Sequence, residues 1–224
     1  MNEPVNELLL KVLLKYELIC FDFDGVIKDS VAVKERCYLE TFRRICSDQL
    51  SLQQIAVHHN SNGGVSRFEK VPIYLRMCKI EVTESNIRLA LEDFAARCVE
   101  AVIESPWIPG FLELHDELID MNKKTAVVSA TPQAEMIEIC NQLDLSGKLS
   151  AIYGAPARKD AAILKLAEKF NLALQSVCLI GDSSSDAQAA SNLGIDFIYR
   201  AHSSCSSCYP YPSIISVQDY LNHG

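Results

Sequence analysis

The feature that most constrains the fold is a repeated pattern in which a short apolar run ends in a polar cluster. The runs are LICF, TAVV, AIY, VCLI and DFIY, and helical patterns follow most of them. Runs of this length between turn signals are typical of fully buried strands, and helices between them are typical of βαβ crossovers. The pattern therefore predicts an α/β fold with a parallel sheet flanked by helices. In such sheets, ligands gather at the carboxyl ends of the strands.

Helices are expected over residues 111–121, 133–142, 160–170 and 186–192. Thr131 before Pro132 has the pattern of an N-cap residue followed by a first-turn proline, so it is expected to begin one of these helices. The N-terminal run ELLLKVLLKYELICF is interrupted by charges and follows acidic residues, which is unlike a signal peptide. It predicts an amphipathic helix followed by a strand.

One interval, from about residue 31 to residue 104, has no strand pattern. Three stretches in it have the apolar spacing of amphipathic helices: 31–46, 65–78 and 83–104. The polar stretch HHNSNGGVSR lies between them, and His58 and His59 are interpreted as surface loop residues. The sequence thus predicts a core domain of residues 1–29 and 106–224, with a helical domain of residues 30–105 inserted after the first strand.

Composition excludes some classes of partner. The 224 residues carry a net charge of −8 at pH 7, which argues against nucleic acid or an anionic membrane surface. No segment reaches the ~20 apolar residues of a membrane span. The nine cysteines are scattered and odd in number, so a secreted disulfide framework is not expected. We expect a cytoplasmic protein, either monomer or homodimer.

One cysteine pair, Cys205 and Cys208 with His202 nearby, has the spacing of metal ligands. A zinc ribbon needs a second such pair, and the sequence has none. A polar surface loop is the favoured interpretation of this tail.

Carboxylates follow two of the predicted strands. Asp22 and Asp24 stand at positions i and i+2 after LICF, so both can face one site. Side by side they can be ionised together only with a cation nearby. Asp182 and Asp186 follow VCLI in the stretch GDSSSD. With Asp22 they would form a hard, oxygen-rich site of the kind that suits Mg²⁺.

Two further clusters supply groups that bind anions. Ser129 follows TAVV beside a helix start, where a hydroxyl and free N–H groups bind anions. Lys159, just before another helix, provides a fixed cation for a phosphoryl oxygen. Together these groups predict a phosphoryl-transfer site. There one aspartate of the DFD pair attacks phosphorus, and the other protonates the leaving oxygen and later deprotonates water.

The motifs DFDGV, VVSAT, ARKD and GDSSSD stand in the order of the haloacid dehalogenase (HAD) superfamily. The chain resembles its phosphoglycolate phosphatase and β-phosphoglucomutase-like branch over residues 18–200. This resemblance implies a Rossmann-like core and an α-helical cap. It implies that Asp22 is the nucleophile, that Asp24 is the acid/base, and that Ser129 and Lys159 bind the phosphoryl group.

The resemblance also implies the cofactor and the partner. Asp182, Asp186 and the backbone carbonyl of Asp24 would hold Mg²⁺ beside Asp22. The partner would be a small phosphorylated metabolite, such as a sugar phosphate or a phosphoglycolate-like acid.

The inserted helices are expected to set the specificity. The segment from Gly64 to Arg67 is similar to a loop that β-phosphoglucomutase-like members lower over the substrate. Arg67 would bind a second phosphate, a carboxylate or a sugar hydroxyl through its planar fork. Lys34 lies where relatives often place a polar residue that faces the substrate, and Thr131 is a further candidate for substrate binding. The alternative for Lys34 and Arg67 is a solvated surface charge.

Other activities compete with a phosphatase. A sugar phosphomutase would share Asp22 and Asp24, but mutase-like relatives tend to carry glycine where this chain has Asp186. A dehalogenase would not need Asp24 or Mg²⁺. A phosphonatase would need a cap lysine; Lys70 is available, but its surrounding motif does not match. A catalytically idle, sugar-phosphate-binding regulatory protein would have no reason to keep Asp24.

Overall fold

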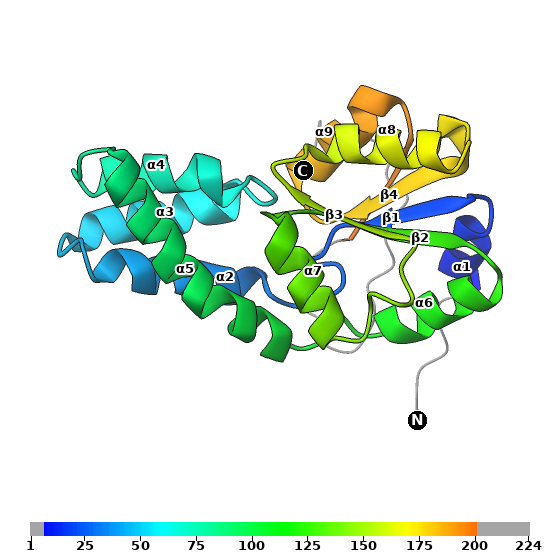
Figure 1. The fold of residues 1–224 in the computed structure, drawn as a ribbon, viewed down its shortest axis with the longest axis horizontal. Helices are drawn as coiled ribbons and strands as arrows, with labels where there is room; N and C mark the ends of the chain where they lie inside the picture. Colours follow the sequence, from blue (N-terminus) through cyan, green and yellow to red (C-terminus); the bar gives the residue numbers. More distant parts are fainter. Residues whose placement is uncertain (1–6, 201–224) are drawn as a thin grey trace.

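A sheet of five parallel strands in the order β3-β2-β1-β4-β5 forms the centre of the protein (Figure 1). This computed structural model describes residues 7–200. The strands are β1 (Leu18–Phe21), β2 (Lys124–Pro132), β3 (Ala151–Ala155), β4 (Val177–Gly181) and β5 (Asp196–Tyr199). Each contains one of the predicted apolar runs, so the predicted α/β fold with a parallel sheet is confirmed.

Alternate residues of the strands face two different helical layers. In β1, Ile19 and Phe21 pack toward α1, α6 and α7, whereas Leu18 and Cys20 pack toward α8 and α9. The helices of these layers are α1 (Glu7–Leu13), α6 (Phe111–Asp120), α7 (Gln133–Gln142), α8 (Lys159–Lys169) and α9 (Ser184–Leu193), with a short 3-10 helix η1 (Leu174–Ser176) before β4. Burial on both faces explains why the strands are apolar throughout rather than alternating.

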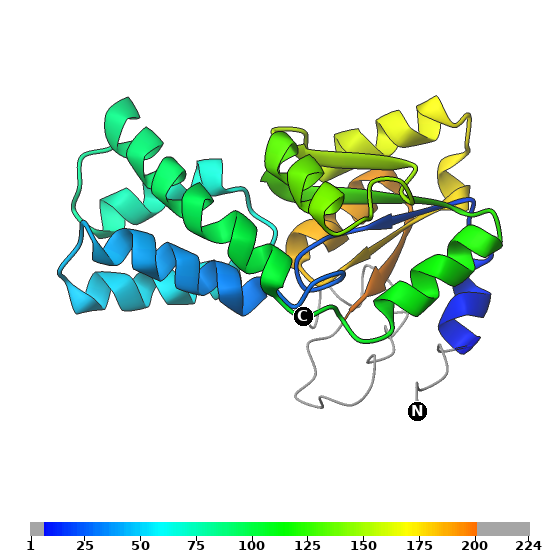
Figure 2. The same ribbon diagram turned by 60° about the horizontal axis from the view of Figure 1, so that its bottom comes forward.

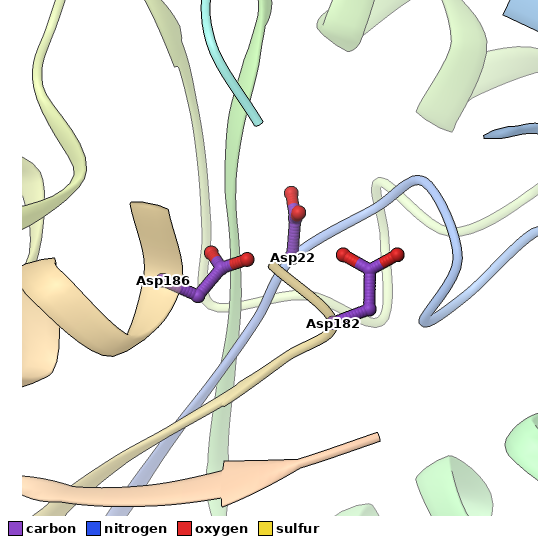
Figure 3. A group of neighbouring side chains, drawn as sticks. All are labelled: Asp22, Asp182 and Asp186. Carbon is purple, nitrogen blue, oxygen red and sulfur yellow. The ribbon is translucent and has the colours of Figure 1, made fainter. Parts of the chain in front are cut away.

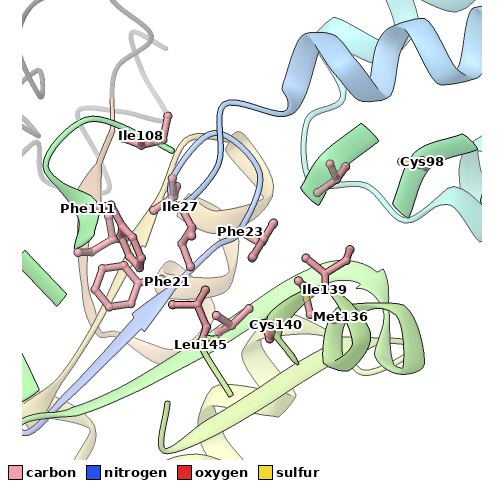
Figure 4. Close-up of a cluster of buried hydrophobic side chains, with 14 of the residues drawn as sticks. Phe21, Phe23, Ile27, Cys98, Ile108, Phe111, Met136, Ile139, Cys140 and Leu145 are labelled. Carbon is pink, nitrogen blue, oxygen red and sulfur yellow. The ribbon is translucent and has the colours of Figure 1, made fainter. Parts of the chain in front are cut away.

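Aromatic and aliphatic side chains fill the space between β1, α6 and α7 (Figure 4). The rings of Phe21 and Phe111 meet edge to face at 5.5 Å, and both are fully buried. Phe23 and Ile27, just beyond β1, extend the same core toward the inserted helices. The segment that carries the paired aspartates is therefore fixed by a packed core on its apolar side.

The interval without strands forms a group of helices beside the sheet (Figure 2). It contains α2 (Val31–Arg43), α3 (Gln49–Ser61), α4 (Arg67–Met77) and α5 (Glu84–Glu104). Helix α3 was not predicted, because its apolar face is weak. The prediction that His58 and His59 lie in a surface loop is wrong: both belong to α3, and His59 is buried.

The boundaries of the helices after β2, β3 and β4 differ slightly from the prediction. Strand β2 continues to Pro132, which is itself the N-cap of α7, so Thr131 does not cap that helix. The helices after β3 and β4 begin one and two residues earlier than expected, at Lys159 and Ser184. Among residues 7–200, no helix has both the length and the apolar character needed to cross a membrane. His202, Cys205 and Cys208 lie outside the described residues.

Candidate active site

Three carboxylates converge at the carboxyl ends of the two central strands (Figure 3). Asp22 follows β1, Asp182 follows β4, and Asp186 lies in the first turn of α9. One carboxylate oxygen from each lies within 4.8 Å of the others. Strands β1 and β4 are neighbours in register, and the N–H of Asp22 donates to the carbonyl of Ile180 at 2.9 Å. The parallel pairing thus brings two distant sequence motifs to one point.

Asp186 is held in place by the start of its own helix. Ser183 is the N-cap residue of α9, and its backbone N–H donates to Asp186 Oδ2 at 3.2 Å in a capping box. Gly181 is required beside it, because a Cβ at this position would lie 2.3 Å from the Cβ of Asp186. The motif GDSSSD therefore serves both to begin a helix and to turn a buried carboxylate toward the site.

Lys159 connects these acids to the start of α8. Its ammonium group lies 2.9 Å from Asp22 Oδ2 and also forms an ion pair with Asp186. The burial of Lys159 would lower its pKa, but the charges of Asp186 and Asp22 raise it above its usual value. Lys159 is therefore a permanent cation beside two carboxylates of the site.

The charge balance of the site fits a metal ion. Burial raises the pKa of Asp22, and the charges of Asp186, Asp182 and Asp24 raise it further, against the lowering effect of Lys159. One lysine thus does not compensate the gathered carboxylates. Three carboxylate oxygen donors close together are the ligands that Mg²⁺ prefers. Asp22, Asp182 and Asp186 could hold such an ion.

The carboxylate of Asp24 contacts the start of the inserted helices. Its Oδ1 accepts a hydrogen bond from Ser30 Oγ at 2.6 Å, and its Oδ2 forms an ion pair with Lys34 of α2. Burial alone would raise the pKa of Asp24, but Lys34 and Ser30 lower it below its usual value. Lys34 also donates to Thr131 Oγ1 at 2.8 Å. The contact with Ser30 could not be read from the sequence.

Two neighbouring cavities contain the predicted residues. The larger, of about 550 Å³, is lined by Asp22, Asp24, Lys34, Thr131 and Asp182, among other residues. The smaller, of about 350 Å³, is lined by Ser129 and Lys159. Gly64 lines both cavities with φ at +71°, and a Cβ there would lie 2.0 Å from Ser185 Oγ. The inserted segment therefore approaches the start of α9 so closely that it needs glycine.

Comparison with known proteins assigns the family. The sequence model of the haloacid dehalogenase-like hydrolase family matches residues 19–199. The chain belongs to this family. The predicted family and the prediction of an enzyme are thereby confirmed.

This haloacid dehalogenase-like hydrolase is similar to one curated protein in sequence and to solved structures in fold. A phosphorylated carbohydrates phosphatase of Thermotoga maritima is 27% identical over 188 residues, covering 82% of this chain and 84% of its own. The crystal structure of a predicted phosphoglycolate phosphatase from Haemophilus somnus has a TM-score of 0.68 at 19% identity, covering 91% of this chain and 90% of its own. CbbY from Rhodobacter sphaeroides, solved with xylulose-(1,5)-bisphosphate, has a TM-score of 0.67 at 19% identity, with coverages of 84% and 87%.

Within this hydrolase, Arg67 lies at the cavity but is already paired. Arg67 begins α4. Its Nη1 atom donates a hydrogen bond to Glu135 Oε1 on α7 at 2.9 Å, and its Nη2 atom lies 2.8 Å from Glu135 Oε2. Its guanidinium also lies 4.5 Å from the centre of the Phe94 ring. Arg67 is thus buried rather than a solvated surface charge, and in this structure it connects an inserted helix with the sheet layer.

Two further residues of the inserted helices face the larger cavity and were not predicted as ligands. Lys70 and His59 both line it, and both are buried. Lys70 lies three residues after Arg67 on α4, so helical periodicity places both residues on the same face of the helix. This spacing is the signal in the sequence that could have indicated Lys70. His59 carried no such signal, because its helix was not recognised.

Proposed function

We propose that this hydrolase is a Mg²⁺-dependent phosphatase that cleaves a small phosphate monoester through an aspartyl-phosphate intermediate. The observation that carries the proposal is the convergence of Asp22, Asp182 and Asp186 around Lys159 at the ends of adjacent strands. Phosphoryl transfer depends mainly on positioning and on compensation of negative charge, and this cluster supplies both.

In the first step an oxygen of Asp22 attacks phosphorus, and the bond from phosphorus to the leaving oxygen breaks. Asp24 gives its proton to that oxygen. Lys159 and the hydroxyl of Ser129 bind phosphoryl oxygens, and Mg²⁺ held by Asp22, Asp182 and Asp186, with the backbone carbonyl of Asp24, would compensate their charge. In the second step Asp24 takes a proton from water, and the water oxygen attacks phosphorus and releases Asp22.

The ion pair of Asp24 with Lys34 supports a division of labour between the paired aspartates. Asp22 is surrounded by acids and Lys159, whereas Asp24 is surrounded by Ser30 and Lys34. Different surroundings are what two carboxylates need to act as nucleophile and as acid/base. For Asp24 to carry a proton, Lys34 must leave it when the substrate binds.

The inserted residues 30–105 would act as a cap domain over a core of residues 1–29 and 106–224. The larger cavity supports this, because residues of α2, α3, α4 and α5 line it together with residues from the strand ends. Its volume of about 550 Å³ suits a sugar phosphate or a phosphoglycolate-like acid. Asp186 favours hydrolysis over the phosphomutase alternative. We propose a cytoplasmic enzyme, either monomer or homodimer.

A phosphate-release screen across small phosphorylated metabolites, with Mg²⁺ and with a chelator, tests the proposal. We expect release from at least one sugar phosphate or phosphorylated acid in the presence of Mg²⁺ and a loss of release with the chelator. Unchanged rates in the chelator would contradict the role of the metal, and no release from any compound would contradict the phosphatase.

A further inference from the structure

Lys70 is a buried cation that faces the larger cavity without a carboxylate partner. Its side chain is 2% exposed, and it lines the same cavity as Asp22 and Asp24. Within the described part of the chain, its polar contact is with His59 Nδ1 at 3.4 Å, and it forms no ion pair there. A buried charge is unfavourable unless it is paired, so this arrangement calls for an anion.

His59 orients Lys70 but does not neutralise it. Burial lowers the pKa of His59 to about 3, and the charge of Lys70 contributes to that shift. The ring also packs against the ring of Tyr38, with centroids 5.1 Å apart. His59 is thus neutral, and its Nδ1 can only accept a hydrogen bond from the ammonium group.

The other two cations that line this cavity are already compensated. Arg67 forms its two-pronged pair with Glu135, and Lys34 forms its pair with Asp24. Lys70 therefore contributes a positive charge that the described residues do not balance locally. Burial and the charge of Lys34 lower the pKa of Lys70 to about 8, and the charge of Asp24, which is itself paired with Lys34, opposes this only in part. The amine is therefore still mostly protonated at neutral pH.

We propose that Lys70 binds a second anionic group of the substrate, a carboxylate or a second phosphate, on the cap side of the cavity. This inference rests on the proposed function, since the first phosphate is the one transferred to Asp22. Lys70 thus takes the role in substrate binding that the sequence suggests for Arg67, because the guanidinium of Arg67 is already paired with Glu135. The preferred substrates are then compounds with two anionic groups rather than sugar monophosphates, whose phosphate is their one anionic group.

Matched substrates test the proposal with Mg²⁺ present. One pair is phosphoglycerate and glycerol phosphate, which differ by a carboxylate in place of a hydroxymethyl group. The other is fructose bisphosphate and fructose monophosphate. The compound p-nitrophenyl phosphate has no second anion and reports the phosphatase activity alone. The enzymes are the wild type, Lys70→Met, Lys70→Gln and the control Arg76→Met, which changes an exposed cation on the same helix.

We expect the wild type to favour the doubly anionic member of at least one pair by about tenfold or more in kcat/KM, as a charge-assisted hydrogen bond would give. The pair that shows the preference tells whether the group is a carboxylate or a phosphate. Lys70→Met and Lys70→Gln should reduce the preference to within about threefold of unity, by lowering kcat/KM for the doubly anionic member more than for its matched partner. Arg76→Met should keep both the preference and the rate with p-nitrophenyl phosphate.

Equal losses on both members of a pair would show a structural role for Lys70 and overturn the inference. If p-nitrophenyl phosphate is hydrolysed but the wild type shows no preference in either pair, the inference is overturned. It is also overturned if the Lys70 variants keep the preference of the wild type. A wild type that hydrolyses none of the five compounds would contradict the proposed function itself. Thermal melting checks that the variants are folded, and removing an unpaired buried charge should not lower the melting temperature.

Discussion

The ammonium group of Lys159 lies 2.9 Å from the carboxylate of Asp22, although all of the inserted helices separate the two residues in the sequence. The same ammonium also pairs with Asp186, whose side chain is completely buried. One cation therefore contacts two of the acids at the strand ends but offsets only one of their two negative charges. This arrangement keeps the carboxylates close together in the folded protein and leaves the remaining negative charge for a metal ion.

Replacement of Lys159 by methionine should destabilise the metal-free protein by about 3–5 kcal/mol, because it leaves Asp186 buried without its cation. Urea unfolding in the presence of a chelator measures this. The control is Lys148→Met, which breaks a half-exposed pair with Asp116 and should cost less than about 1 kcal/mol. Equal losses in the free energy of unfolding would show that the buried pairs of Lys159 stabilise the protein no more than an exposed ion pair does.

Replacement of Asp24 by asparagine should slow turnover by about 10²–10⁴-fold, as expected for loss of a general acid/base. Asparagine keeps an oxygen that can accept from Ser30, so the fold and substrate binding should persist. Steady-state kinetics and calorimetric binding of a substrate distinguish the two effects. A variant that binds and turns over like the wild type would remove Asp24 from the chemistry.

The pair of Arg67 with Glu135 should stabilise the contact between α4 and α7 by about 1–3 kcal/mol of coupling energy. Arg67 donates one hydrogen bond to Glu135 Oε1 at 2.9 Å, its second terminal nitrogen lies 2.8 Å from Oε2, and its side chain is only 5% exposed. A double-mutant cycle with Arg67→Met and Glu135→Gln measures this coupling by unfolding. The exposed pair of Arg88 with Glu92 is the control, with an expected coupling of about 0.3–0.5 kcal/mol. Similar couplings in both cycles would contradict the prediction.

His115 should make the protein less stable at mildly acidic pH. Burial lowers its pKa from 6.5 to about 4 in the folded state, so the unfolded chain takes up the proton first as the pH falls. Its contribution is complete above pH ~6.5 and is lost toward pH ~4. From pH 7 to pH 5 the wild type should lose about 2 kcal/mol more than His115→Gln. Parallel pH profiles of urea unfolding would show that His115 does not titrate in this way.

The strands could be predicted because β1 and β4 are fully buried and β2 nearly so, and because the partly exposed edge strands β3 and β5 also keep short apolar runs. The run LICF is the whole of β1, and DFIY is the whole of β5. The positions of Asp22, Asp182 and Asp186 follow from the same rule, since the ends of parallel strands meet at one edge. Helix α3 was missed because Leu52, Ile55 and His59 give it only a narrow buried face.

The contacts of the inserted helices could not be predicted, since they depend on how two groups of helices meet in space. The spacing from Asp24 to Lys34 indicated a polar residue near the site but not the ion pair between them. Glu135 gave no signal as the partner of Arg67, because the two are 68 residues apart and on different helices. Which cations of the cavity remain uncompensated is thus a property of the tertiary structure alone.

The central claim is that Asp22 itself receives the phosphoryl group, and chemical trapping tests it most directly. The enzyme is quenched during hydrolysis of p-nitrophenyl phosphate with Mg²⁺, and borohydride then reduces any aspartyl-phosphate to homoserine. Peptide mass spectrometry locates the product. We expect homoserine in place of Asp22 in the wild type and no such product in Asp22→Asn. Reduction at Asp24 or Asp182 instead, or steady turnover with Asp22 never modified, would contradict it.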